Sequence, residues 1–298
     1  MLSAVERKIE QFVGELNDKE VVSLYTKLPQ GKRLRAKLIL KIAGTSLSAI
    51  KTAAVVEMIH AASLLHDDVI DDAYTRRSKP SLNALYGNKT AIMLGDILYS
   101  KGFFELNNIS ADIAKIVSNA VTQLSLGELK DVSLSKTFNS SREMYLDMIY
   151  QKTASLIEAS AGAAAVLAGK PKETYMVYGR NLGLAFQMID DLLDITSDAE
   201  TLGKPVLHDF MEGKTTLPYI YLYEVLDEAG QQKLVSLHGK VLSSSEQNWI
   251  KVEMEEKQIL MKCFSQAKEL IEEAVELMNS HGETALSGIA MEMIERDF

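Results

Sequence analysis

The pattern of apolar and polar positions divides the chain into long segments rich in Ala, Leu, Met, Glu and Lys, separated by short breaks that contain Gly, Pro or Asn. These residue types favour helices, and no stretch keeps the alternation of a half-buried strand. Residues 51–65 (KTAAVVEMIHAASLL) hold no Gly or Pro and are apolar at nearly every turn, which predicts a buried helix. The pattern as a whole predicts an all-α fold.

The domain organisation follows from what the chain lacks. It has 298 residues and five prolines, with no Ser/Gly/Pro-rich linker and no low-complexity tract. Because nothing marks a boundary, we expect one domain over residues 1–298. The net charge of −9 argues against a nucleic-acid-binding protein, whose binding surface is basic.

Three features bear on location. The N-terminus, MLSAVERKIEQF, has a charged amphipathic pattern instead of the apolar core of a signal peptide. The most apolar tract, residues 159–169, is too short to span a bilayer, and its small residues suit close helix packing. The single cysteine, Cys263, cannot form an intrachain disulfide. We therefore expect a cytoplasmic protein with no transmembrane segment.

Two acidic motifs stand inside apolar helical segments. In residues 64–77 (LLHDDVIDDAYTRR), a continuing helix places Asp67 and Asp71 on one face, with Asp68 about a quarter turn away. Such a cluster usually marks a helix cap or a solvated loop, but like charges at this spacing destabilise a buried helix unless a cation lies between them. Residues 186–194 (FQMIDDLLD) repeat the spacing. All-oxygen ligands that leave room for water and phosphate favour Mg²⁺. The candidate ligands are Asp67, Asp68, Asp71, Asp190, Asp191 and Asp194.

Basic residues occur in several separate motifs of this acidic chain. Lys32 and Arg35 in GKRLR are spaced to share a helix face, and Arg76 and Arg77 follow the first acidic motif directly. Further lysines stand in the later stretches QKTASL and LGKPVLHDFMEGKTTLP, namely Lys152, Lys204 and Lys214. Each cluster alone is compatible with a solvated surface. Together with the acidic motifs they suit two phosphorylated ligands, one bound through metal and one bound directly.

Two other motifs admit different interpretations. GKT at residues 213–215 lacks the upstream glycine and the preceding strand of a nucleotide-binding P-loop. Glu57 and His60 form one E-x-x-H pair, whereas a di-iron helical bundle needs two. His60 lies seven residues before Asp67 on nearly the same helix face, where it can donate to a phosphate. A locally bonded core histidine is the alternative.

The ordered motifs GKRLR, HDDVIDDAYTRR, QKT, FQMIDDLLD and LGKPVLHDFMEGKTTLP resemble those of trans-type polyprenyl diphosphate synthases, the head-to-tail prenyltransferases, and of the long-chain, octaprenyl-producing type in particular. The resemblance covers nearly the full length. It implies the isoprenoid synthase fold, a single large helical bundle around a central apolar cavity. It also implies Mg²⁺ as cofactor, isopentenyl diphosphate and an allylic diphosphate as substrates, and a homodimer.

The resemblance also implies residue roles. The six aspartates would hold magnesium, and catalysis would rest on Asp67, Asp68, Asp71, Arg76, Lys152, Asp190, Asp191 and Lys204. The allylic diphosphate would contact Arg76, Lys152, Thr153, Gln187, Lys204 and Lys214. Isopentenyl diphosphate would contact Lys32, Arg35, His60 and Arg77. One departure is visible: Leu207 stands where the family commonly has Gly, two residues before Asp209. The sequence therefore does not determine the backbone conformation of this loop.

Product length should depend on the apolar helix before Asp67. An isoprene unit is about as long as one helical turn, ~5.4 Å. The residues that would meet the first added unit, Ser63 and Ala62, are small where short-chain enzymes of the family place an aromatic residue, and Ile59 follows one turn further. Close helix packing is the other interpretation. A bulky side chain must end elongation at some length, and the candidates for this steric stop are Phe103, Phe104, Leu126 and Tyr145.

We therefore expect an enzyme that extends farnesyl or geranylgeranyl diphosphate into a long-chain all-trans polyprenyl diphosphate for quinone side chains, with transient membrane contact for product release. The alternatives are a short-chain farnesyl or geranylgeranyl diphosphate synthase, a class I terpene cyclase, and a non-catalytic regulatory subunit of a heteromeric synthase. A cyclase would mix Asn, Ser and Glu in its second motif, and a regulatory subunit would lack one acidic cluster. This chain has two all-Asp motifs.

Overall fold

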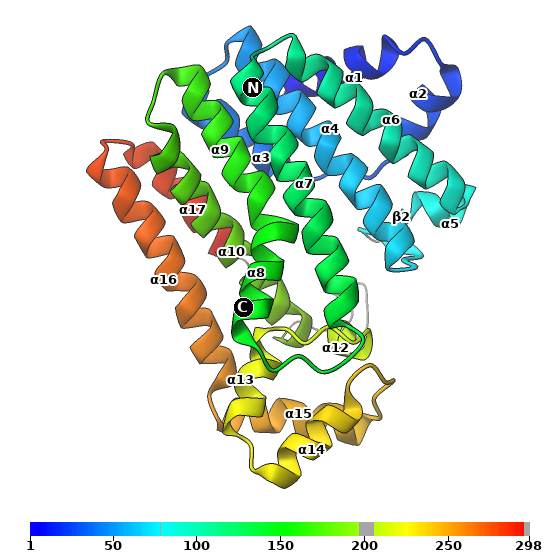
Figure 1. Ribbon diagram of the computed structural model, residues 1–298, viewed down its shortest axis with the longest axis vertical. Helices are drawn as coiled ribbons and strands as arrows, with labels where there is room; N and C mark the ends of the chain where they lie inside the picture. Colours follow the sequence, from blue (N-terminus) through cyan, green and yellow to red (C-terminus); the bar gives the residue numbers. More distant parts are fainter. Residues whose placement is uncertain (78, 197–205, 295–298) are drawn as a thin grey trace. The chain divides into compact units, whose positions relative to one another are not determined.

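The computed structural model describes residues 1–77, 79–196 and 206–294, and this part of the chain is helical apart from one short hairpin (Figure 1). The all-α prediction is confirmed. The chain forms two compact units, the first made of Met1–Val121 with Leu156–Met176 and the second of Thr122–Ser155 with the residues from Val177 onward. The expectation of a single domain over residues 1–298 stays a prediction.

The first unit contains α1 (Leu2–Gly14), α2 (Lys19–Tyr25), α3 (Leu34–Ala43), α4 (Leu47–Ile70), the hairpin β1 (Thr75–Arg76) and β2 (Lys79–Pro80), α5 (Leu82–Tyr86) and α6 (Asn88–Asn107). The second contains α8 (Arg142–Ile149), the π-helical turn η1 (Tyr150–Ala154), α12 (His208–Met211), α13 (Leu217–Val225), α14 (Glu228–Leu237), α15 (Ser244–Glu256), α16 (Ile259–Ser280), the 3₁₀ turn η2 (Thr284–Leu286) and α17 (Ser287–Ile294). Three helices, α7 (Ala111–Leu134), α9 (Ser155–Ala168) and α10 (Lys172–Thr196), contribute residues to both units.

Helix α4 forms the core of the first unit, as its apolar sequence predicts. It begins where the side chain of Ser46 accepts a hydrogen bond from the Ala49 N–H at 3.2 Å, and it runs beside α6 (Figure 1). Gly102 of α6 permits this approach, since a Cβ there would lie 3.3 Å from Ile59. By length and composition α4 could cross a membrane, but most of its apolar window is buried inside the protein, as in a core helix.

The remaining helices bury the faces that their sequences predict. In α1 the buried residues Val5, Ile9 and Phe12 recur at helical spacing, in agreement with the amphipathic N-terminus. In the small-residue tract of α9, a Cβ added at Gly162 would lie 2.6 Å from Met176. The small residues there do allow close packing within the first unit.

The second unit contains a π-helical turn that two glycines accommodate. Beyond Ile149 the helix widens over Tyr150–Ala154 (η1) before α9 begins. A Cβ on Gly127 of α7 would lie 2.2 Å from the backbone nitrogen of Lys152, and a Cβ on Gly183 of α10 would lie 2.4 Å from Cα of Ala154. Single π-helical turns occur frequently at functional sites. This one carries the QKT motif.

Candidate active site

The first acidic motif lies at the C-terminal end of α4. The helix continues through Asp67 and Asp68 to Ile70, and the N–H of Asp71 still donates to the carbonyl of Asp67 at 2.8 Å. Asp71 is therefore the helix cap, and Asp72 turns the chain with φ +48°. The predicted spacing of Asp67 and Asp71 by one helical turn agrees with this geometry.

Asp68 is the buried member of the motif, and Arg76 neutralises it. Only 4% of Asp68 is exposed. Two nitrogens of Arg76, Nε and Nη2, lie 2.6 and 2.5 Å from its Oδ1. Burial raises the pKa of Asp68, as does Asp71, while Arg76 opposes the rise. In the free protein each charge of this pair therefore compensates the other.

The hairpin carrying Arg76 is attached to the end of α4 by side-chain hydrogen bonds. Asn83 of α5 donates from Nδ2 to the carbonyls of Asp68 and Ala73 at 3.0 and 3.1 Å. Ser81 donates to the same Ala73 carbonyl at 2.6 Å. These contacts fix the chain between the aspartates and the arginines.

Positive charge gathers around His60 in the first unit. Arg77, with φ +53°, donates from Nη1 to the carbonyl of Pro29 at 2.9 Å, and its guanidinium lies over Gly31, where a Cβ would be 2.7 Å away. Burial lowers the pKa of Arg35, and the charge of Arg77 lowers it further. Burial together with Arg35, Arg77, Arg76 and Arg33 lowers the pKa of His60 well below its usual range. Such a concentration of cations suits a polyanionic ligand.

One detail of the sequence prediction is wrong. The spacing of Lys32 and Arg35 suggested that they share a helix face, but α3 begins at Leu34, after Arg33 adopts a left-handed conformation with φ +53°. Lys32 therefore precedes the helix and is exposed, whereas Arg35 is partly buried. The physical reason is the pairing of Arg33 with carboxylates on α1 and α4, which fixes its conformation.

In the second unit a chain of hydrogen bonds joins three predicted residues. Thr153 donates to Oε1 of Gln187 at 2.7 Å, and Nε2 of Gln187 donates to Oδ1 of Asp191 at 2.8 Å. The hydroxyl of Tyr145 donates to the other carboxylate oxygen at 2.5 Å. Burial and the charge of Asp209 raise the pKa of Asp191 well above its usual range, and the hydrogen bonds from Tyr145 and Gln187 oppose the rise.

Leu207, the departure from the family pattern, takes the backbone conformation that glycine adopts readily. Its φ is +60° and ψ is 29°. Its N–H donates to the carbonyl of Asp194 at 3.0 Å, and the N–H of Asp209 donates to Oδ2 of Asp194 at 3.2 Å. The left-handed conformation costs roughly 1–2 kcal/mol in a non-glycine residue, and complete burial of the Leu207 side chain offsets it. Leu207 thus holds this conformation although it is not a glycine.

Lys152 lies between two acids of α7. Its Nζ is 2.5 Å from Asp131 and 3.0 Å from Glu128, both buried. Burial by itself lowers the pKa of this lysine, but the two carboxylates outweigh burial and raise it. Lys214, which follows the positive-φ residue Gly213, lies 3.1 Å from Glu212. Lys204 lies outside the described residues.

The chain-length candidates lie in the interior of the first unit. Ile59 and Ala62 are fully buried, and Ser63, 3% exposed, donates to the carbonyl of His60 at 2.9 Å. Two of the candidates for the steric stop are too exposed to block a chain that grows in the interior, since Phe104 is 62% and Leu126 44% exposed. Tyr145, a third, is buried but engaged with Asp191.

The donor chemistry of the acidic motifs fits a hard divalent cation. Among the described residues, no three His, Cys, Asp or Glu side chains gather closely enough to hold a metal by themselves. Mg²⁺ prefers oxygen ligands such as these and keeps several waters when it binds. The residues that would hold it are Asp67, Asp68 and Asp71 in the first unit, and Asp190, Asp191 and Asp194 in the second.

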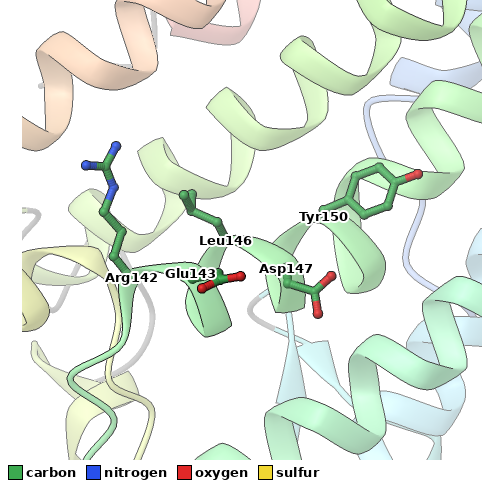
Figure 2. Close-up of a pocket in the computed structure, with 5 residues that line it drawn as sticks. All are labelled: Arg142, Glu143, Leu146, Asp147 and Tyr150. Atoms are coloured by element: carbon green, nitrogen blue, oxygen red, sulfur yellow. The ribbon is translucent and has the colours of Figure 1, made fainter.

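A broad hollow lies on the second unit. Five side chains of α8 and η1 line it, namely Arg142, Glu143, Leu146, Asp147 and Tyr150 (Figure 2). Arg142 and Leu146 project to one side of the helix, and Glu143 and Asp147 to the other. Asp147 pairs with Lys130 of α7. None of the five is a predicted site residue.

Sequence reasoning missed the residues that hold the predicted ones in place. Glu128 and Asp131, three residues apart on the apolar helix α7, form an acidic pair that could have been noticed from spacing alone. Glu57 was visible only as half of an E-x-x-H motif. The sequence singled out Tyr145 only as a candidate for the steric stop, and no local signal identifies its contact with Asp191, which is 46 residues away.

Comparison with known proteins agrees with the resemblance seen in the sequence. The model of the family described as "Polyprenyl synthetase" matches residues 19–279. A short chain isoprenyl diphosphate synthase of Methanothermobacter thermautotrophicus is 38% identical over 221 residues, which are 70% of this chain and 68% of that protein.

Two solved structures extend the likeness to the whole fold. The octaprenyl pyrophosphate synthase of Helicobacter pylori superposes with a TM-score of 0.93 at 42% identity, over 99% of this chain and 98% of its own. A polyprenyl synthase of Caulobacter crescentus, complexed with calcium and isoprenyl diphosphate, has a TM-score of 0.90 at 29% identity, over 99% of this chain and 94% of its own.

Proposed function

The chain belongs to the polyprenyl synthetase family, and from that premise we propose that it joins isopentenyl diphosphate to an allylic diphosphate, farnesyl or geranylgeranyl, to make a long-chain all-trans polyprenyl diphosphate. The observation that carries the proposal is the group of cations around His60. Arg77 donates to the carbonyl of Pro29 and lies over Gly31 of the GKRLR segment, and Arg33, Arg35, Arg76 and Arg77 together lower the pKa of His60. A diphosphate is the ligand whose charge suits such a group.

Two different groups of residues would bind the two substrates. Arg35, Arg77 and His60, with the exposed Lys32, would bind isopentenyl diphosphate directly. Arg76, Lys152, Thr153, Gln187 and Lys214, with Lys204, would contact the allylic diphosphate. Magnesium, when bound to the aspartates, would neutralise charge on the leaving diphosphate.

The chemistry starts when the allylic carbon–oxygen bond breaks and its electron pair passes to the departing diphosphate. Arg76 and Lys152 stabilise the negative charge that develops there. The double bond of isopentenyl diphosphate attacks the allylic carbon and forms the new carbon–carbon bond. A proton then leaves the isopentenyl unit, and the released diphosphate is the base that accepts it. The apolar wall of α4 excludes water, which would otherwise trap the cation as an alcohol.

The proposed long product, destined for a quinone side chain, is supported by the small buried residues Ala62 and Ser63, one turn before Asp67. The likeness to an octaprenyl pyrophosphate synthase over nearly the whole chain supports it as well. The short-chain alternative is favoured by the archaeal relative, whose name specifies a short-chain product. A regulatory subunit is disfavoured because both all-Asp motifs are present.

We further propose a cytoplasmic homodimer that meets a membrane only transiently, to release its product. The single Cys263, a buried free thiol, is compatible with a reducing compartment. Exposed apolar side chains on α6, Ile92, Met93 and Phe104, support a partner surface.

The test is incubation of the purified protein with magnesium, labelled isopentenyl diphosphate and farnesyl diphosphate, with the dephosphorylated products resolved by chain length. A ladder that ends at a long polyprenol is the expected result. Products of fifteen or twenty carbons would keep the prenyltransferase and replace the long-chain assignment by the short-chain one. Absence of incorporation with any allylic primer, in folded protein, would overturn the proposal.

A further inference from the structure

Glu57 is a buried carboxylate to which neither the metal sites nor the proposed diphosphate contacts give a role. It lies on α4, one turn before His60, and only 3% of it is exposed. Its Oε1 accepts the backbone N–H of Ala36 at 2.9 Å, and its Oε2 lies 3.5 Å from Nη1 of Arg33. Burying a carboxylate is costly unless it is paired and hydrogen-bonded, and both conditions are met here.

The first of these contacts caps a helix that cannot cap itself. Helix α3 begins after Arg33, whose side chain makes no cap hydrogen bond. Ala36 is in the first turn of α3, where backbone N–H groups have no partner within the helix. Glu57 supplies the acceptor from α4, and its negative charge is favourable at a helix N-terminus.

The second contact fixes an unusual backbone conformation. Arg33 is left-handed, with φ +53° and ψ 43°, a conformation that residues other than glycine, asparagine and aspartate seldom adopt. Its guanidinium also donates to both carboxylate oxygens of Glu6 on α1, at 2.6 and 3.0 Å. Two carboxylates on two helices thus hold the one residue that separates Lys32 from α3.

Glu57 also counters the repulsion among the cations next to it. Its charge opposes the lowering of the pKa values of Arg35 and Arg77. Nε of Arg35 is buried and has no hydrogen-bond partner among the described residues. The start of the GKRLR segment therefore depends on Glu57 both for its backbone geometry and for its charge balance.

We propose that Glu57 is a positioning residue for isopentenyl diphosphate, which anchors the GKRLR segment so that Lys32 and Arg35 bind this substrate together with Arg77. The inference rests on the proposed function. Glu57 touches neither substrate and acts through Ala36 and Arg33.

The test compares Glu57→Gln and Glu57→Ala with the wild-type enzyme. Gln keeps an oxygen that can accept from Ala36 but loses the charge, whereas Ala loses both. We expect KM for isopentenyl diphosphate to rise about tenfold in Glu57→Gln and further in Glu57→Ala. The reason is that one charge-assisted contact contributes about the free energy that corresponds to a tenfold change in affinity. KM for farnesyl diphosphate and kcat at saturation should stay within about twofold of the wild-type values.

Glu105→Gln is the matched control. Glu105 is also a buried carboxylate of the first unit, and its Oε1 lies 2.5 Å from Nζ of Lys101, away from the GKRLR segment. We expect a lower melting temperature in this variant with unchanged KM values. An unchanged KM for isopentenyl diphosphate in folded Glu57→Gln, or an equal rise in both KM values, would overturn the inference. If the Glu57 variants do not fold, Arg33→Gln should show the same selective rise, and its absence there would also overturn it.

A second readout separates this inference from the proposed function. Calorimetric titration of metal-free protein with inorganic diphosphate measures the affinity of the basic residues for diphosphate and does not require turnover. If wild-type protein forms no product but binds diphosphate, and Glu57→Gln weakens that binding about tenfold, the function fails while the anchoring role stands. Equal diphosphate binding by wild-type and Glu57→Gln protein would overturn the role itself.

Discussion

The hydroxyl of Tyr145 donates a hydrogen bond of 2.5 Å to Oδ2 of Asp191, so the two residues meet across 46 positions of the sequence. Tyr145 is fully buried, and Gln187 donates to the other oxygen of the same carboxylate. Both oxygens of Asp191 are therefore oriented by neighbouring side chains before a cation binds. Partners of this kind commonly tune the ligands of a metal site.

Replacing Tyr145 by Phe should weaken magnesium binding. The substitution removes one of the two hydrogen bonds that oppose the raised pKa of Asp191, so the ionised, metal-binding form becomes less favourable. We expect the magnesium concentration for half-maximal turnover to rise about tenfold. The free energy of unfolding should fall by about 1.5–3 kcal/mol, the net value of one hydrogen bond to a charged group. Magnesium titration of turnover and urea unfolding measure the two effects.

Tyr178→Phe is the control for that variant. The Tyr178 hydroxyl is buried in the same unit and donates to the carbonyl of Leu286 at 2.8 Å. Its loss should lower stability by about 0.5–1.5 kcal/mol, the net value of a hydrogen bond to a neutral group, without changing the magnesium requirement. The same magnesium response in both variants would show that the effect of Tyr145 is general destabilisation.

Gly127→Ala should displace the π-helical turn that carries Lys152 and Thr153. The added Cβ would lie 2.2 Å from a backbone nitrogen, so the two helices must separate. We expect a loss of stability of about 1–3 kcal/mol or more from overpacking. Turnover should fall as well, because Thr153 leaves its 2.7 Å contact with Gln187.

Gly288→Ala in α17 provides the comparison, since a Cβ there meets nothing within 4 Å. It should stabilise the protein by about 0.5–1 kcal/mol, as Ala generally does in place of a helical Gly. Thermal unfolding and kcat of the two variants are the measurements. A Gly127→Ala enzyme with wild-type stability and kcat would show that the π-helical turn tolerates displacement.

Binding of isopentenyl diphosphate should be accompanied by proton uptake at His60. In the free protein, burial and the surrounding arginines keep this histidine neutral by lowering its pKa. A bound diphosphate brings negative charge, which raises the pKa, so His60 gains up to one proton when the ligand binds. By linkage, affinity increases as pH falls through the pKa of the complex and levels off below that of the free protein.

Calorimetry in two buffers of different protonation enthalpy measures this uptake. His60→Gln should abolish it, while His281→Gln, at the exposed end of α16, should leave it unchanged. Binding without proton exchange by the wild-type protein between pH 6 and 7, roughly the range in which histidine titrates, would indicate that His60 stays neutral beside the ligand.

The part of the site that lies on single helices could be predicted from the sequence. The apolar run before Asp67 and the spacing of Asp67 and Asp71 are local properties, and the helix Leu47–Ile70 carries them as expected. The order of motifs indicated which basic residues belong together. Arg77 does approach Gly31, although 46 residues separate them.

What could not be predicted depends on long-range contacts. The left-handed Arg33, which separates Lys32 from α3, results from carboxylates 24 and 27 residues away. Leu207 adopts the left-handed backbone conformation typical of glycine because burial of its side chain offsets the strain. The hydrophobic periodicity of a sequence carries no information about such a balance. Exposure of Phe104 and Leu126 likewise depends on packing that apolar character alone does not determine.

Ala62→Phe tests whether this position limits product length. Ala62 is fully buried one turn before Asp67, where a phenyl ring would block a chain that grows along α4. We expect shorter products with the rate of isopentenyl incorporation retained. Chromatography of the dephosphorylated products gives their length, and thermal unfolding reports any overpacking, which would cost about 1–3 kcal/mol.

Val55→Phe turns the prediction into a graded one. Val55 is also fully buried and lies on the same helix face as Ala62, seven residues further from Asp67, which is ~10.5 Å along the helix or about two isoprene units. Its products should therefore be about two units longer than those of Ala62→Phe and shorter than those of the wild-type enzyme. Destabilised variants that still make the wild-type product would show that Ala62 and Ser63 are small for helix packing alone. A graded series, by contrast, requires that the chain grow along this face of α4, because packing defects have no reason to scale with distance from Asp67.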